Sequence, residues 1–307
     1  MSKTVRKACD YSMKYFEKHP FLMIVIGVFG ISLSSIFVKY SPAPSAVTAA
    51  WRLLWTVIVM SPVVLGKKEF RQELAAASRS NILLSCLSGL FLAIHFALWF
   101  ESLRHTSVAS STTIVCTEVI WVCLGFWLFM KGKISKRAIL AIAVTLCGSV
   151  LIAFADSSSG AHLYGDILAL LAAIAVAAYM LIGRVVREKL STSVYTYIVY
   201  CACELSLLIL CAAQRNNIFA FGAAPSIVGL LLAIFSTILG HSIFSWCLKY
   251  FSPSFVSASK LCEPVVAAIL AAILFLEVPK ALQILGGSLI IGGVLYYSRI
   301  ERMEMQQ

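Results

Sequence analysis

The sequence predicts an all-α integral membrane protein of ten transmembrane helices, built as two inverted repeats of five helices with both termini in the cytoplasm. Three observations lead to this prediction. Apolar runs of about 20 residues follow one another with short polar breaks, which is the pattern of successive membrane-spanning helices. The chain matches itself at an offset of 145 residues. Its Lys and Arg residues gather on one side of the expected membrane.

Composition excludes several classes of protein. The chain is 60% hydrophobic and 13% charged, whereas a soluble domain carries about 25% charged residues. The net charge of +11 is therefore interpreted as basic loops that orient membrane helices, and no nucleic-acid partner is expected. The ten Cys residues lie mostly in apolar runs and none has C-x-x-C spacing. We therefore expect neither a disulfide framework nor a metal site.

The expected elements are helices, because a backbone in lipid must satisfy its own hydrogen bonds. A basic cytoplasmic segment, 1–20, precedes them, and the apolar run that follows it is too long for a signal peptide. The first repeat, 21–156, contains the spans 21–40, 45–65, 81–101, 107–130 and 135–154. The second repeat, 164–298, contains the spans 164–183, 192–213, 225–249, 253–276 and 279–298, and a cytoplasmic tail, 299–307, ends the chain.

Orientation follows from the basic residues. With the N-terminus placed in the cytoplasm, nineteen of the 25 Lys and Arg residues fall in cytoplasmic segments, four fall outside and two lie within spans. This asymmetry favours ten helices with both termini inside.

The self-match relates the two halves directly. The offset of 145 places Leu103 on Leu248 and Glu118 on Glu263, and a single-residue gap brings His95 onto His241. Five is an odd number of helices, so the halves enter the membrane in opposite senses. Inverted repeats of this kind are typical of secondary transporters, whose binding site lies near the membrane midplane between the halves.

Two carboxylates are expected deep in the membrane. Glu118 and Glu263 each lie about 16 Å into their spans by helical rise, near the middle of a core roughly 30 Å thick. An ionisable group there costs at least about 2.5 kcal/mol, so each asks for a reason. Either the pair faces a central cavity, where it binds a cation or amine or trades protons for substrate, or each is a structural carboxyl between packed helices.

Two basic residues accompany these carboxylates. Lys260 lies three residues before Glu263, a spacing that allows a pair on one helix face. That pair is interpreted either as self-neutralising or as a substrate contact. Arg52 lies roughly 10 Å from the outer surface by helical rise. It either extends outward to the lipid headgroups or reaches a substrate carboxylate or phosphate.

Further candidates surround the repeated corners. His95 and His241 are interpreted either as packing groups or as hydrogen-bond partners and proton relays in a cavity. Trp99 follows His95 by one helical turn. Three hydroxyl residues could line a polar path, namely Ser34, Thr113 and Ser259. The sequence contains no H-E-x-x-H, G-x-S-x-G, EF-hand or nucleotide-binding motif, so no cofactor is expected and transport would be driven by gradients.

The segments at 95–111, 240–259 and 261–277 resemble the drug/metabolite transporter superfamily, specifically its EamA-type members. Their carrying motifs read HFALWFESLRHTSVASS, GHSIFSWCLKYFSPSFVSAS and LCEPVVAAILAAILFLE. The last is similar to the L-G-E-P segment of that family, and Arg52 matches an arginine common in its second helix. The resemblance covers residues 21–298 and implies transport of small metabolites.

These observations together predict a multi-pass protein of the plasma or inner membrane. We expect a secondary active transporter, an exporter of a small polar metabolite such as an amino acid or amine, that works by alternating access. Its partners would be the lipid bilayer, the small-molecule substrate and a coupling proton or other ion, with the protein a monomer or weak dimer. An importer of the same fold is the first alternative. A membrane-embedded enzyme that uses His and Glu as acid and base is the second.

Overall fold

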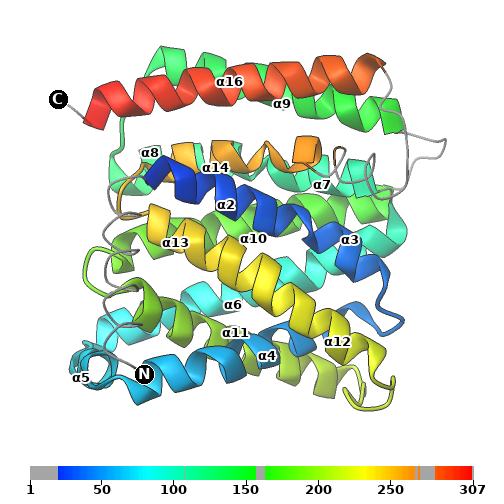
Figure 1. Ribbon diagram of the computed structural model, residues 1–307, viewed down its shortest axis with the longest axis vertical. Helices are drawn as coiled ribbons and strands as arrows, with labels where there is room; N and C mark the ends of the chain where they lie inside the picture. The colour runs from blue at the N-terminus through cyan, green and yellow to red at the C-terminus, as the bar shows by residue number, and fades with distance from the viewer. Residues whose placement is uncertain (1–19, 107, 157–162, 267–268, 270–280, 306–307) are drawn as a thin grey trace, which may run out of the picture.

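The computed structural model describes residues 20–106, 108–156, 163–266, 269 and 281–305. Every regular element in these ranges is helical (Figure 1). Residues 1–19 of the expected cytoplasmic segment and residues 306–307 of the expected tail lie outside them.

The first half of the chain forms eight described helices. They are α2 (Pro20–Ser32), α3 (Ser34–Lys39), α4 (Ser45–Gly66), α5 (Lys68–Ala76), α6 (Arg79–His105), α7 (Val108–Cys116), α8 (Glu118–Met130) and α9 (Lys136–Asp156). The second half contains α10 (Leu163–Val186), α11 (Thr192–Ala213), α12 (Ala224–Leu231), the π-helix η1 (Leu232–Ser242), α13 (Ile243–Cys247), α14 (Pro253–Lys260) and α16 (Ala281–Met305). Most described boundaries fall within a few residues of the predicted spans.

Within the described ranges, eight helices are long and apolar enough to cross a membrane. They correspond to eight of the ten predicted spans. The predicted span 135–154 is present as the helix α9, but it is not among the eight. The predicted span 253–276 is described only in its first part, because residues 267–268 and 270–280 lie outside the described ranges.

The helix α5 was not predicted. It lies in the polar segment between the second and third spans, where the sequence KEFRQELAA lacks the long apolar run by which the spans were recognised. Phe70 and Leu74 pack against the core, while most of the other side chains of the helix are exposed. The carboxylate of Glu73 accepts a hydrogen bond from the backbone N–H of Ser191, at the start of α11. The short amphipathic helix α5 therefore links the segment after α4 to the start of α11 at one end of the bundle.

Two helix breaks occur at positions that the sequence offset of 145 residues relates to each other. Thr117 separates α7 from α8, and Leu261 and Cys262 separate α14 from the helical residues 263–266. The backbone N–H of Thr117 bonds to the carbonyl of Ile114, a tight turn of the 3₁₀ type. Leu261 makes the same bond to Ala258. Each deep carboxylate is thus the first residue after a break.

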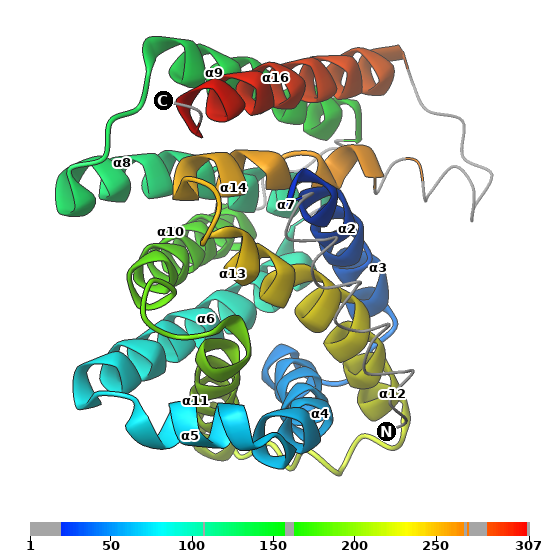
Figure 2. The same ribbon diagram turned by 60° about the vertical axis from the view of Figure 1, so that its left-hand side comes forward.

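The helices form layers, with α9 and α16 outermost (Figures 1 and 2). The next layer holds α7, α8 and α14, and the remaining helices follow beneath it. The start of α2 and the end of α16 lie on the same side of the bundle (Figure 1).

The α9–α16 contact depends on two glycines. A Cβ atom added at Gly148 would lie 2.5 Å from the carbonyl oxygen of Gly286, and one added at Gly286 would lie 2.6 Å from the carbonyl oxygen of Gly148. The two backbones therefore touch without side chains between them, which is the small-residue packing typical of membrane helices.

The variant Gly148→Val is expected to lower the free energy of unfolding by about 1–3 kcal/mol, because it forces the two backbones apart. The measurement is the thermal midpoint of the detergent-purified protein. Gly292→Val is the matched control, since nothing lies within 4 Å of a Cβ atom at Gly292. Equal midpoints for both variants would contradict the packing argument.

Candidate functional site

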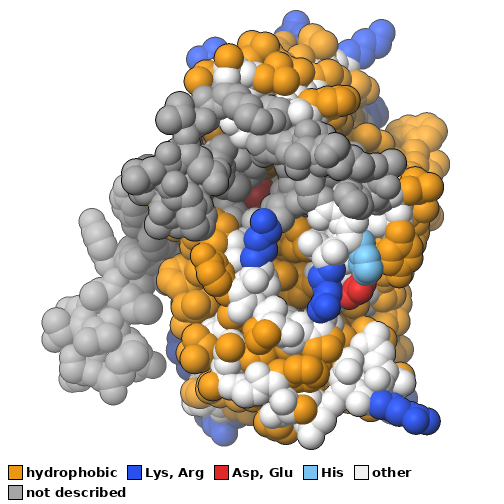
Figure 3. Space-filling model, turned by 90° about the vertical axis from the view of Figure 1, so that its right-hand side faces the viewer, with side chains coloured by type: hydrophobic (Ala, Val, Ile, Leu, Met, Phe, Trp, Pro, Cys, Tyr) orange, Lys and Arg blue, Asp and Glu red, His pale blue; other side chains and the backbone are white. Residues whose placement is uncertain are grey.

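A small cavity lies between the inner layers, and helices from both halves of the chain line it. Its volume is about 40 Å³, which is room for about three water molecules. The lining residues are Ile31, Ser34, Arg52, His95, Trp99, Val115, Cys116, Glu118, Val176, His241, Lys260 and Glu263. Figure 3 shows a recess in the right-hand face of Figure 1, with an acidic side chain visible inside it.

Eight of the ten predicted site residues line this cavity, and two do not. The eight are Glu118, Glu263, Lys260, Arg52, His95, His241, Trp99 and Ser34. The hydroxyl of Thr113 donates to the carbonyl of Ser149 at 3.4 Å instead. The hydroxyl of Ser259 donates to the carbonyl of Phe255, within its own helix, at 2.8 Å. Both hydroxyls bond to backbone carbonyls, and neither residue lines the described cavity.

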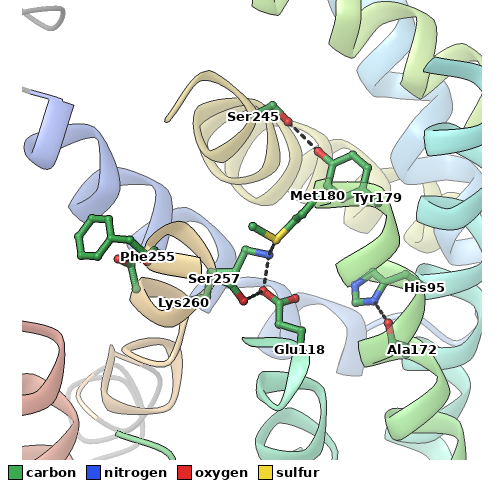
Figure 4. A network of polar contacts seen from close by, with 10 residues as sticks. His95, Glu118, Ala172, Tyr179, Met180, Ser245, Phe255, Ser257 and Lys260 are labelled. Atoms are coloured by element: carbon green, nitrogen blue, oxygen red, sulfur yellow. Dashed lines mark hydrogen bonds and ion pairs between the residues drawn. The ribbon is translucent and has the colours of Figure 1, made fainter. Parts of the chain in front are cut away.

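A buried ion pair joins the two halves. The Lys260 Nζ atom lies 2.8 Å from Glu118 Oε1, and both side chains are almost fully buried (Figure 4). The Ser257 hydroxyl donates to the same carboxylate oxygen at 3.0 Å. Helix α14 brings Ser257 and Lys260 to this position together, because residues three apart share a helix face. The sequence spacing allows Lys260 to pair with Glu263 on one helix, whereas in the structure Lys260 pairs with Glu118 from the other half of the chain.

Glu263 is left without that partner. Its side chain is 9% exposed, and its Oε1 atom has no hydrogen-bond partner among the described residues. An unpaired oxygen buried in this way costs free energy, about 1–3 kcal/mol. The two carboxylates therefore differ, because Glu118 is neutralised by Lys260 and Glu263 retains a free oxygen.

Arg52 is fully buried and faces the cavity. Its Nε atom donates to the Thr237 hydroxyl at 2.7 Å, and its Nη1 atom donates to the Ser34 hydroxyl at 3.2 Å. The guanidinium carbon lies 4.1 Å from the centre of the Phe96 ring, within the range of a cation–π contact. Its Nη2 atom has no partner among the described residues. The interpretation that Arg52 extends to the headgroups is therefore wrong.

The two histidines meet at the cavity wall. Their ring centres lie 6.3 Å apart, and the His95 ring stacks on Trp99 at 5.8 Å. The His95 Nδ1 atom lies 3.0 Å from the carbonyl oxygen of Ala172 (Figure 4). A carbonyl only accepts hydrogen bonds, so Nδ1 carries a proton and His95 Nε2 remains for other partners. The ring atom His241 Nδ1 and the indole Nε1 of Trp99 lack partners among the described residues.

Sequence reasoning missed the apolar wall of the cavity. Ile31, Val115, Cys116 and Val176 line it beside the polar groups. An apolar residue in an apolar span carries no signal that separates a cavity-facing position from a lipid-facing one. The thioether of Met180, 3.4 Å from Lys260 Nζ, was missed for the same reason.

The EamA-like transporter family model matches the chain twice, over residues 20–154 and 163–299. The chain belongs to the EamA-like transporter family. It is a multi-pass membrane protein, and its family points to a transporter rather than an enzyme.

Relatives of this EamA-like transporter support that assignment. The pseudopaline exporter CntI of Pseudomonas aeruginosa is 25% identical over 285 residues, which cover 92% of this chain and 96% of the relative. An uncharacterized transporter of Bacillus subtilis, YxxF, is 24% identical over 276 residues, 89% of this chain and 85% of the relative. A solved crystal structure matches with a TM-score of 0.74 at 15% identity, over 93% of this chain and 99% of that one. The last likeness concerns the fold alone.

Proposed function

We propose that this protein is a secondary active exporter of a small polar metabolite, such as an amino acid or amine. The observation that carries the proposal is the cavity, which both halves of the chain line with buried charged side chains. Charges in a membrane interior are expensive and mark substrate or ion pathways. The volume of about 40 Å³ is smaller than such a substrate, so in this proposal the site widens when the halves move.

We propose ten spans in two inverted repeats as the framework for this movement. The two successive matches to one family model support it, as do the equivalent helix breaks before Glu118 and Glu263. The start of α2 and the end of α16 lie on one side of the bundle (Figure 1), which agrees with termini that share the cytoplasm. Inverted halves can exchange shapes, and this exchange would open the cavity to each side in turn.

The polar groups divide into two sets in this proposal. The Lys260–Glu118 pair holds the halves together across the cavity. Glu263 and Arg52 retain free polar atoms for the transported molecule. Glu263 is also the carboxyl that would exchange a proton for a cationic group of the substrate. Export is favoured because a relative that matches almost the whole chain is named an exporter.

Flux into proteoliposomes tests the proposal. With the wild-type protein, we expect saturable movement of a radiolabelled amino-acid or amine mixture when a pH gradient is imposed, and loss of this movement when a protonophore collapses the gradient. Protein-free liposomes are the control. In intact cells, expression should lower the internal level of the transported compound, whereas an importer would raise it. Chemical conversion of the compound in detergent, without a second compartment, would argue for an enzyme instead.

A further inference from the structure

We infer that the cavity selects zwitterions, with the substrate carboxylate on the Arg52 guanidinium and the substrate ammonium on the Glu263 carboxylate. This inference rests on the proposed function and names the class of substrate that the transport site takes. It also predicts which molecules the site rejects, namely simple amines and simple carboxylic acids of the same size.

The first step is a count of charge. Among the described residues, four side chains with formal charges line the cavity, namely Arg52, Lys260, Glu118 and Glu263. Lys260 and Glu118 neutralise each other at 2.8 Å. In the state with Glu263 ionised, one cation and one anion remain, and the described residues contain no ion pair between them. An amine alone would leave Arg52 uncompensated, and a carboxylate alone would leave Glu263 uncompensated. Only a molecule with both charges satisfies both groups in a medium of low dielectric constant.

The second step is the geometry of Arg52. Two hydrogen bonds and the Phe96 ring hold the guanidinium in one orientation. Both hydrogen-bond partners are uncharged hydroxyls, so the positive charge is solvated but not neutralised. The free Nη2 atom leaves its two N–H donors without a partner among the described residues, and a carboxylate is the acceptor that a guanidinium binds most strongly. A group fixed in this way loses little entropy when it binds.

The third step is the position of Glu263. It lies on the partly described ninth span, directly after a helix break, whereas Arg52 lies on α4 in the other half. Its free Oε1 atom accepts hydrogen bonds and suits an ammonium group. The two ends of one substrate would therefore contact opposite halves of the protein. A single-charge molecule would contact only one half with its charge and would not link them.

The fourth step concerns the side chain of the zwitterionic substrate. Ile31, Val115 and Val176 supply apolar wall next to the polar groups. The side chain of the zwitterion is accordingly expected to be short and apolar rather than charged. A further substrate charge would find no unpaired partner among the charged side chains that line the described cavity.

Ligand-dependent thermal stabilisation of the purified full-length protein tests this inference. The probes are L-alanine and L-leucine, their amine analogues ethylamine and isoamylamine, and their acid analogues propionate and isocaproate. We expect each amino acid to stabilise the wild-type protein at a concentration at least about tenfold lower than either of its analogues, a difference of about 1.4 kcal/mol. In the variant Glu263→Gln the preference should move towards the acids, and in Arg52→Gln it should move towards the amines.

Three results would overturn the inference. They are equal stabilisation of the wild-type protein by an amino acid and one of its analogues, no stabilisation by either amino acid, and an unchanged order of preference in Glu263→Gln. If Arg52→Gln does not fold, the order of preference in Glu263→Gln is sufficient to test the inference. Gradient-driven flux in proteoliposomes separates this inference from the proposed function. If amines or acids inhibit the flux as strongly as amino acids do, the protein is still a transporter but the zwitterion site is refuted.

Discussion

Replacing Lys260 with Met is expected to lower the free energy of unfolding by about 3 kcal/mol, because it leaves the Glu118 carboxylate buried without its cation. Lys260 is 7% exposed and Glu118 is 3% exposed, so water does not replace the lost partner. The Ser257 hydroxyl remains, but one neutral donor does not balance a full charge. Thermal unfolding of the detergent-purified variant measures the effect.

The double variant Glu118→Gln/Lys260→Met should recover most of this stability. Removal of both members of a buried ion pair is often neutral, whereas removal of one is costly. Lys249→Met provides the matched control, since Lys249 is exposed and its loss should change the midpoint little. If the single and double variants unfold at the same temperature, the Lys260–Glu118 pair does not contribute in this way.

The second expected result is a loss of transport without a loss of stability. The variant Glu263→Gln should lower flux at least about tenfold, equivalent to about 1.4 kcal/mol, because the free carboxylate is the anionic contact for the substrate. Its stability should stay the same or rise, since the variant removes a buried and unpaired charge. Flux in proteoliposomes and thermal unfolding are measured on the same preparation.

Glu204→Gln is the matched control for this experiment. Both carboxylate oxygens of Glu204 are buried and have no partner among the described residues, and Glu204 does not line the cavity. The variant should therefore show a similar change in stability with normal flux. Equal flux in the two variants would refute the role of Glu263 in the transport site.

The periodic features of the fold were accessible from sequence. Long apolar runs predict spans because the membrane has a set thickness, and eight of the expected ten correspond to apolar helices of sufficient length. The family resemblance was also accessible, since its motifs are local runs of residues. The helix α5 was not, because it is short and polar and depends on contacts of Phe70 and Leu74 with other helices.

Most residues of the candidate site were predictable from the sequence, but their hydrogen bonds and ion pairs were not. An ionisable residue inside a membrane span is costly and therefore rare, whichever way its side chain points. Its presence in an apolar run is enough to identify it as a candidate, as for Glu118, Glu263, Lys260 and Arg52. Hydroxyl residues do not stand out in this way, because Ser and Thr often bond to a carbonyl one turn back in the same helix. Ser259 does so, and Thr113 bonds to a carbonyl of the neighbouring helix α9. Only their contacts distinguish them from Ser34, which lines the cavity.

The sequence by itself determined that this chain is a membrane protein with a repeated pattern and that its rare internal charges lie deep in the spans. The tertiary structure decided which charges neutralise each other. Sequence spacing offers Lys260 only the partners on its own helix, such as Glu263 three residues away. The packing of α14 against α8 places Glu118 at 2.8 Å instead, and the strength of an ion pair depends on that distance and on burial. For this reason Glu263 and Arg52, rather than Glu118, are the charged side chains of the cavity that retain free polar atoms.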